Sequence, residues 1–426
     1  MRIVVRANDA RAARQGQTLL AAAGVNAAAV LGGAAAPQGE DISIYPALDG
    51  VAPVPSERDA ALVRLIGRRA AAPPLIGLQQ TAAFSGAVML DGSPKLLAAQ
   101  IEAWMRLATA NDERARRAAT AASFEVASPS PTEPRKLKAL YIGAPSSMFL
   151  ALERVLADAG GIVAAAFSSY AGFDHLHDEP FDAVVLNGAQ DAQTAISLCA
   201  ALRRNATLYH LPTMVITAPG DSATAAASIE RGASAVTEAN APCGPSLGWL
   251  FEAVRRERRR RTAEHEMLAY RDLLGDARTG LWRRETFEAH LARLTGDHHS
   301  SGRSMSLAVL RVMPAHGARA PEESVWRKGF AEIASLASRL MRDADSGAAF
   351  GADLIAIALP ASDLRSAKRT AERIASVAEC TAFASGDGGA GPLVFEQSAV
   401  ELQPGESGMG MLARALRALE VEAIPA

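Results

Sequence analysis

Two charged side chains three residues apart, Arg342 and Asp345, carry the clearest chemical potential in this sequence. A guanidinium presents a rigid fork of N–H donors that fits a phosphate, or the O6 and N7 acceptors of guanine. A carboxylate beside it accepts hydrogen bonds from donor groups such as those on the edge of that base. Residues at this spacing also form ordinary ion pairs on protein surfaces. The pair therefore predicts either a nucleotide-binding site or a structural contact.

A second short motif follows this pair after five intervening residues. Residues 351–355, with the sequence GADLI, resemble the signature of GGDEF (diguanylate cyclase) domains. Asp353 occupies the third position of that signature and Leu354 the fourth. Further segments match the same family in order and spacing, namely DARTGLWRRETFEAHL (276–291), SLAVLRVMPAH (306–316) and MLARALRAL (411–419). We therefore expect residues 270–426 to form a GGDEF domain with the nucleotide cyclase-like α/β fold.

The resemblance also identifies catalytic positions, and these have changed. In the family, the first strand and the third signature position supply acids that hold the metal for phosphoryl transfer. The strand positions here are Arg311 and Met313, so Asp353 remains alone and would face a guanidinium in an ion pair. Leu354 would leave guanine donors unpaired, which costs about 1–3 kcal/mol. We expect no catalytic residues, no metal at this site and no enzyme activity.

The product-binding site of the family, in contrast, is retained in sequence. The resemblance implies that Arg342 and Asp345 form this inhibitory site, whose ligand is cyclic di-GMP. It also implies a third ligand-binding residue, Arg373, on the helix that follows the hairpin. An arginine there would supply a second cation to a phosphate or a base.

The region before this domain predicts two parallel sheets. In residues 137–262, apolar runs such as LKALYIG alternate with segments of helical periodicity, which is typical of a doubly wound α/β fold. Residues 1–120 show the same alternation, with strand candidates RIVVRA, NAAAVLGG, ISIYPAL, PLIGL and GAVML. Leu48-Asp49-Gly50 matches Leu186-Asn187-Gly188 at the end of the third strand. Both blocks resemble response-regulator receiver domains, so the expected fold is two receiver-like (flavodoxin-like) domains followed by the GGDEF domain.

Receiver phosphorylation needs an acceptor Asp and further acids that hold Mg²⁺. The second block has Asn187 at the acceptor position and no acid after its first strand, which indicates a pseudo-receiver. The first block has Asp49 at that position and Asp9 after strand one, with a lysine displaced to Lys95. Asp49 is thus a possible phosphoacceptor, although an Asp before Gly is also a common turn residue.

Three further segments have a composition of their own. Residues 121–136 are rich in Ser, Pro and Thr, which predicts a linker. Residues 252–274 predict a charged connecting helix, in which RRERRRR (255–261) is either a solvated face or the source of an arginine that clamps the ligand. His298 and His299 are interpreted as a loop pair without metal partners.

Composition excludes several classes of function. A formal net charge of −2 gives no general attraction to nucleic acid or anionic membrane. The three cysteines lie far apart, without metal-binding spacing, which fits a reducing compartment. No signal peptide and no segment long and apolar enough to span a membrane is evident. The sequence predicts a cytoplasmic protein.

These patterns together favour a catalytically inactive cyclic di-GMP effector that recruits protein partners. The resemblance to tandem-receiver GGDEF effectors implies a homodimer at a cell pole, with an RcdA-like adaptor and the ClpXP protease as partners in cell-cycle control. Two alternatives remain open: a response regulator with diguanylate cyclase activity, and a signalling scaffold driven by phosphorylation.

Overall fold

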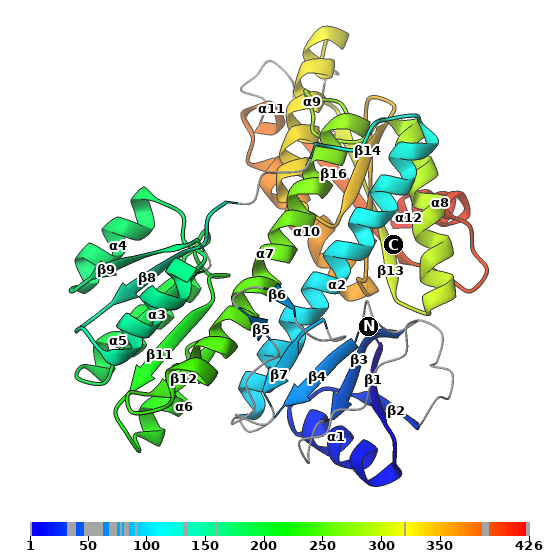
Figure 1. Cartoon of the computed structure of the whole chain (residues 1–426). Helices are drawn as coiled ribbons and strands as arrows, with labels where there is room; N and C mark the ends of the chain where they lie inside the picture. The colour runs from blue at the N-terminus through cyan, green and yellow to red at the C-terminus, as the bar shows by residue number, and fades with distance from the viewer. Residues whose placement is uncertain are drawn as a thin grey trace. The chain divides into compact units, whose positions relative to one another are not determined.

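The computed structural model describes residues 2–31, 40–46, 63–67, 75–76, 79–80, 85–89, 93–130, 135–158, 160–318, 321–385 and 392–422 (Figure 1). These residues divide into two compact units. One unit contains Arg2–Ala108 and Thr132–Arg261, and the other contains Thr109–Pro131 and Thr262–Ala426. Helices α2 (Pro94–Ser123) and α7 (Cys243–Leu274) each contribute residues to both units.

The first unit contains two parallel sheets with the same strand order. The first sheet has the order β2 (Ala27–Leu31), β1 (Arg2–Ala7), β3 (Glu40–Pro46), β4 (Val63–Gly67) and β7 (Ala87–Met89). The second has the order β9 (Ile162–Ala166), β8 (Lys138–Ile142), β10 (Ala183–Asn187), β11 (Thr213–Thr217) and β12 (Ala235–Glu238). Both orders, read along the chain as 2-1-3-4-5, are those of flavodoxin-like sheets. The predicted mixed α/β class with parallel sheets is confirmed.

Helices between these strands begin at short polar side chains. They are α1 (Ala10–Ala22), α3 (Ser147–Asp158), α4 (Ser169–Asp178), α5 (Ala192–Arg204) and α6 (Ser222–Glu230). Asp9, Ser168, Asp191 and Asp221 each accept a hydrogen bond from a backbone N–H of the first turn that follows. Such caps satisfy donors that the helix itself leaves unpaired.

The fourth strand of the first sheet corrects our sequence interpretation. PLIGL was expected to be that strand, but Leu75–Ile76 forms β5, which pairs with β6 (Gln79–Gln80) in a separate antiparallel ladder. The sheet position belongs to β4, whose neighbours are β3 and β7. Its segment VRLIG is short and contains an arginine, which weakened the apolar signal.

The second unit is built on an antiparallel sheet. Its strand order is β14 (Ser346–Phe350), β15 (Leu354–Pro360), β13 (Met305–Pro314) and β16 (Leu393–Glu401). The accompanying helices are α8 (Arg284–Ser301), α9 (Glu323–Leu340), α10 (Leu364–Glu379), α11 (Ala382–Ser385) and α12 (Gly408–Glu422).

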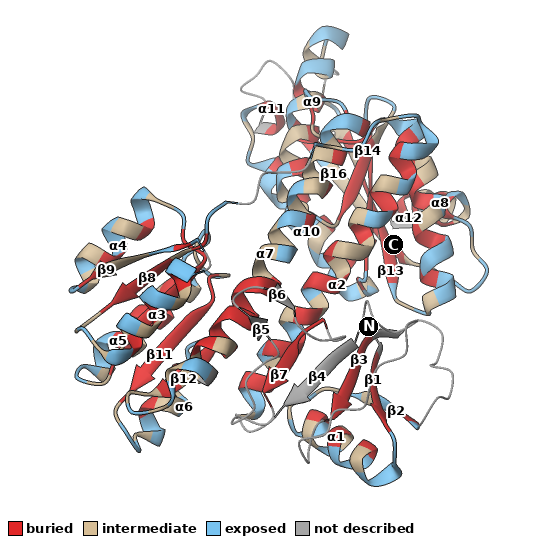
Figure 2. Cartoon of the chain, in the orientation of Figure 1, coloured by how far each residue is buried: buried red, intermediate tan, exposed pale blue. Residues whose placement is uncertain are grey.

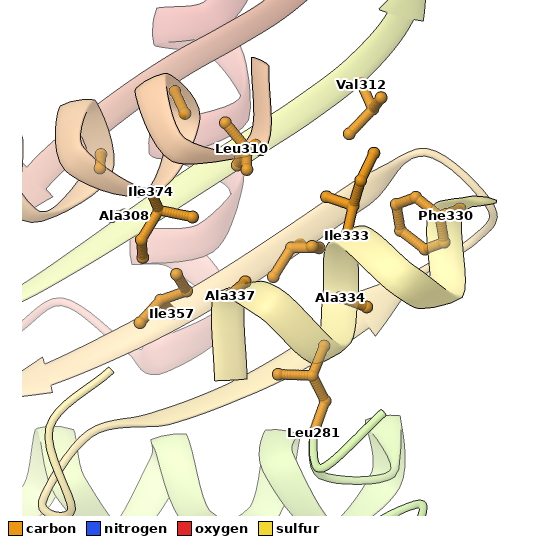
Figure 3. Packing of buried hydrophobic residues seen from close by; sticks show 14 of the residues in the cluster. Leu281, Ala308, Leu310, Val312, Phe330, Ile333, Ala334, Ala337, Ile357 and Ile374 are labelled. Carbon is orange, nitrogen blue, oxygen red and sulfur yellow. The ribbon is translucent and has the colours of Figure 1, made fainter. Parts of the chain in front are cut away.

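Alternate residues of β13 face two different apolar cores. Leu310 and Val312 belong to a cluster with Ile333 of α9 and Ile374 of α10, as the side chains in Figure 3 show. Val309, one residue away, belongs to a second cluster with α8 and α12. This period of two is what a strand covered on both faces requires. Helix α10 meets the sheet through small residues, with Ala367, Ala371, Ala375 and Ala378 all buried.

The burial pattern separates sheet interiors from helix surfaces in both units (Figure 2). Two interpretations of the sequence prove wrong in detail. The linker expected from residue 121 begins later, because α2 continues to Ser123. His298 and His299 lie in the last turn of α8 rather than in a loop. Within the described ranges, no helix is both long and apolar enough to cross a bilayer.

The charged run of α7 is also not a solvated face throughout. Arg255 and Arg256 are 7% and 8% exposed, and Glu252 is 1% exposed. Arg255 donates a hydrogen bond to Glu252 (2.7 Å), and the Arg256 guanidinium lies 5.4 Å from the centre of the Trp104 ring. These arginines therefore stabilise the packing of the first unit. The expected domain boundaries at 1–120, 137–262 and 270–426 stay predictions.

Candidate functional site

The loop between α9 and β14, residues 341–345, holds Arg342 and Asp345 in direct contact. Asp345 Oδ1 accepts a hydrogen bond from Arg342 Nη2 (2.9 Å). Its Oδ2 accepts from Arg342 Nε (3.2 Å) and from the Arg342 backbone N–H (2.8 Å). The Asp345 N–H in turn donates to Arg342 O (2.9 Å), which closes a tight turn. The two residues therefore form a preorganised fork rather than two independent side chains.

The two partners differ in exposure. The Asp345 side chain is 0% exposed, whereas that of Arg342 is 56% exposed. Burial raises the pKa of the Asp345 carboxyl, and the adjacent Arg342 guanidinium offsets only part of that effect. The buried carboxylate thus fixes a guanidinium whose outer side stays open to solvent and to a ligand.

Ser362 is a part of the site that the sequence did not reveal. Its Oγ accepts a hydrogen bond from Arg342 Nη2 at 2.7 Å. Ser362 follows β15 and its backbone carbonyl accepts from Ser306 Oγ (3.0 Å) on β13. The serine therefore connects Arg342 to the sheet. A serine twenty residues from the arginine carries no local signal that would place it here.

Arg373 extends from α10 to the start of the same loop. Its Nη2 donates to Leu340 O (2.8 Å), and Leu340 is the last residue of α9. The side chain is exposed, on the face of α10 that does not enter the core. The structure thus places Arg373 beside the 341–345 loop, where its hydrogen bond to Leu340 O holds it.

The hairpin between β14 and β15 contains the start of the GADLI segment (351–355). Gly351 has φ +77°, a left-handed conformation that favours glycine. Asp353 is exposed, and Leu354 is buried within the sheet. The expected ion pair between Arg311 and Asp353 is wrong, because Arg311 pairs with Glu396 on the opposite strand β16 (3.7 Å). Glu396 was missed because strand register is not visible in the sequence.

A cavity of about 370 Å³ lies next to this hairpin. Its charged lining is mostly basic and consists of Arg278, Arg283, Arg284, Arg327 and the single acid Asp276. Asp276 already accepts hydrogen bonds from the Arg278 backbone N–H (3.0 Å) and the Thr279 hydroxyl (3.2 Å). Among the residues that the structure describes, no three His, Cys, Asp or Glu side chains gather as metal ligands would.

The receiver positions have structural roles where they can be seen. Asn187 Nδ2 donates to Ala144 O (2.7 Å), a bond that a carboxylate could not make because it has no donor. Asp9 caps α1, and Lys95 pairs with Glu230 (2.7 Å). Asp49, the possible phosphoacceptor, lies outside the described residues.

Comparisons with known proteins found no matching family model and no matching curated protein. Solved structures with similarity to this chain include GGDEF domains and a response regulator. The GGDEF domain of DgcB from Caulobacter crescentus, in complex with c-di-GMP, shares 21% identity over 35% of this chain and 86% of that chain, with a TM-score of 0.30. The GGDEF domain of PA1120 from Pseudomonas aeruginosa shares 19% identity over 34% of this chain and 90% of its own, with a TM-score of 0.28.

A putative response regulator from Chloroflexus aurantiacus shares 24% identity over 24% of this chain and 85% of its own, with a TM-score of 0.23. Likenesses at these identities and TM-scores do not assign a function. The proposals that follow therefore rest on the residues of this chain.

Proposed function

We propose that this chain binds cyclic di-GMP at the 341–345 loop and acts as an effector that does not synthesise the dinucleotide. The observation that carries this proposal is the fork of Arg342, which a buried Asp345 holds in place while its outer side stays exposed. Arg373, whose guanidinium is anchored to Leu340 O, supplies a second cation beside the same loop. Cyclic di-GMP offers two phosphates and two guanines to such donors.

The proposed lack of synthesis rests on the hairpin and its neighbouring strand. Where the cyclase family has a carboxylate on the first strand, this chain has Arg311, paired with Glu396. Asp353 is exposed, and most of the charged residues that line the nearby cavity are arginines. Phosphoryl transfer between two GTP molecules needs divalent metal to neutralise phosphate charge. Exposed carboxylates beside several guanidinium groups, as Asp353 and Asp276 are, do not favour that metal.

The recruitment of protein partners is the finer part of the proposal. By its resemblance to the cyclic di-GMP effector PopA, the chain would act at a cell pole with an RcdA-like adaptor and the ClpXP protease. Ligand at the 341–345 loop would favour one of two conformations, and only that conformation would bind the partner. The shift can be no larger than the difference in ligand affinity between the two states.

Titration calorimetry of the full chain with cyclic di-GMP tests the binding site. The wild type should give saturable heat, and Arg342→Ala should bind about 10-fold or more weakly, as expected for loss of one bidentate arginine contact. Arg342→Gln is a second variant that keeps a neutral hydrogen-bond donor for Asp345. Thermal melts of both variants would report any unfolding. Arg339→Ala, an exposed arginine at the end of α9, is the matched control. Equal affinity of wild type and both Arg342 variants would refute the site.

A turnover assay separates the effector from the cyclase alternative. Incubation of the full chain with GTP and Mg²⁺ should yield no cyclic di-GMP over many hours, because Arg311 and Met313 replace the strand acids that would hold the metal in the family. Steady formation of product, at a rate proportional to protein concentration, would show that the chain is an enzyme.

The phosphorylation alternative predicts a different dependence. It requires that Asp49→Asn abolish partner binding while Arg342→Ala leaves it intact. The effector proposal requires the reverse result. The second receiver-like block supports the effector, since Asn187 has no carboxylate that could accept a phosphoryl group and its amide donates to Ala144 O.

A further inference from the structure

Arg117 of α2 connects three segments of the unit that contains the 341–345 loop. Its side chain is 1% exposed. Arg117 Nη1 donates to Met267 O of α7 (2.8 Å). Its Nη2 donates to both Asp343 O (2.7 Å) and Asp345 O (3.0 Å). One buried guanidinium therefore bonds α2, α7 and two carbonyls of the loop.

Glu113 fixes the orientation of this guanidinium. Its side chain is 0% exposed and accepts from Arg117 Nε (2.9 Å), His290 Nε2 (3.0 Å) and Arg116 Nη1 (3.2 Å). Burial raises the pKa of Glu113, but His290, Arg117 and Arg116 outweigh it and lower the pKa to about 2. The carboxylate is thus ionised, and the buried charge of Arg117 is balanced.

Apolar packing keeps water away from these bonds. Arg117 Cζ lies 5.5 Å from the centre of the Trp282 ring, and that ring is 4.5 Å from the ring of His290. The Trp282 backbone N–H donates to Gly347 O (2.8 Å) on β14, the strand that begins directly after the loop. The network is therefore continuous from α2 to the residues on both sides of Asp345.

We propose that Arg117 is a positioning residue for the cyclic di-GMP site, which holds the 341–345 loop in its binding shape and couples ligand occupancy to the α2–α7 helix pair. This inference rests on the proposed function. Arg117 is too deeply buried to touch a ligand, so it acts through the loop carbonyls. The apparent affinity is the intrinsic affinity multiplied by the fraction of molecules whose loop has the binding conformation. A change that loosens the loop therefore weakens binding. By reciprocity, the bound ligand must stabilise the contacts that α2 and α7 make through Arg117.

Arg117→Lys in the full chain tests the positioning role. Lysine keeps the charge near Glu113 but has a single ammonium in place of the fork that bonds two helices and the loop. We expect a cyclic di-GMP affinity about 10-fold weaker, with the fold verified by thermal unfolding. Arg114→Ala, on the same helix and paired with Glu266 (3.1 Å) without contact to the loop, should bind as the wild type does. Wild-type affinity in Arg117→Lys would overturn the inference.

Hydrogen exchange of the wild type provides a readout that needs no variant. Saturating cyclic di-GMP should slow amide exchange by about 10-fold in peptides covering residues 110–123 and 264–272, in proportion to the coupling. The same peptides of Arg117→Lys should show no added protection at full occupancy. Unchanged exchange in the ligand-bound wild type would overturn the inference and leave the proposed function standing. A wild type that binds no cyclic di-GMP would instead refute both.

Discussion

At the scale of single residues, the proposed binding site depends on an asymmetry between two partners, Asp345 and Arg342. Asp345 is buried and Arg342 is half exposed, so the pair resembles neither a surface ion pair nor a buried one. A surface pair contributes little to stability because water screens it. Here the carboxylate cannot reach water, so its role is to orient the guanidinium. The structure shows that the two residues are in contact; that they bind a ligand stays a prediction.

Arg373 provides a prediction at this scale. Arg373→Ala removes a cation beside the loop but only one hydrogen bond to Leu340 O. We expect cyclic di-GMP affinity to fall about 5- to 10-fold, while the free energy of unfolding changes by less than about 1 kcal/mol. Lys368→Ala, also exposed on α10 but well away around the helix, is the control. Titration calorimetry would contradict the prediction if the two variants bound equally well.

Sequence reasoning found residues that local spacing defines and missed those that long-range packing supplies. Arg342, Asp345 and Arg373 could be placed because each lies in a recognisable segment. Ser362 could not, because its contact with Arg342 depends on where β15 ends. Nor could Glu396, whose position opposite Arg311 follows from the register of β13 and β16.

At the scale of elements, α8 is connected to the loop region through a buried histidine. His298 Nδ1–H donates to Leu294 O (2.8 Å), and the Ala361 backbone N–H donates to His298 Nε2 (3.3 Å). Ala361 directly precedes Ser362, the partner of Arg342. Protonation of His298 Nε2 would place its N–H against the Ala361 N–H, and two donors cannot bond to each other. This arrangement therefore requires a neutral ring.

Acidification should therefore destabilise this unit through His298. Burial, together with the charges of Arg116 and Arg303, lowers the pKa of His298 from 6.5 to about 4. Between these values the unfolded chain binds more protons than the folded chain. The stabilisation that depends on neutral His298 is therefore fully present above about pH 6.5 and is lost as the pH falls to about 4. The loss attributable to this histidine is on the order of 3 kcal/mol.

Denaturant unfolding across this pH range measures the effect. His298→Asn should be less stable than the wild type at neutral pH and show a flatter dependence between about pH 6.5 and 4. The exposed neighbour variant His299→Asn should keep the wild-type slope. Parallel curves for wild type and His298→Asn would contradict the assignment.

The elements that the sequence pattern misidentified depend on contacts with residues far away along the chain. Apolar periodicity assigned most strands, but it chose PLIGL over the short segment Val63–Gly67, whose pairing depends on both neighbours. The charged run of α7 was expected to be solvated because arginine and glutamate usually are. Arg256 is buried because an aromatic ring, Trp104, lies 5.4 Å away, and such a partner cannot be located from one segment.

At the scale of the whole molecule, the unit with the binding site is discontinuous in sequence. It combines Thr109–Pro131 with Thr262–Ala426. From the first segment, Glu113, Arg117, Thr120 and Ala121 are each no more than 1% exposed. The sequence predicts a linker at residues 121–136 and a domain over residues 270–426. The structure completes its core with the end of α2.

This architecture predicts the behaviour of a truncated chain. Residues 262–426 alone should unfold at a lower temperature than the same segment joined to residues 109–131, because Trp282 and His290 lose their cover and the loop carbonyls lose Arg117. Cyclic di-GMP affinity should also be lower by about 10-fold or more. Thermal unfolding and calorimetry of the two fragments would check this. Identical melting temperatures would mean that α2 is dispensable.

The arginine that supports the loop carbonyls is separated from them by 226 and 228 positions along the chain. A comparison that predicts ligand binding only from the residues around the β14–β15 hairpin would therefore accept a chain in which residue 117 had been replaced. If the chain binds cyclic di-GMP as proposed, selection should leave its trace at both places. A substitution far upstream, with the recognition motif untouched, is the change that such a comparison would overlook.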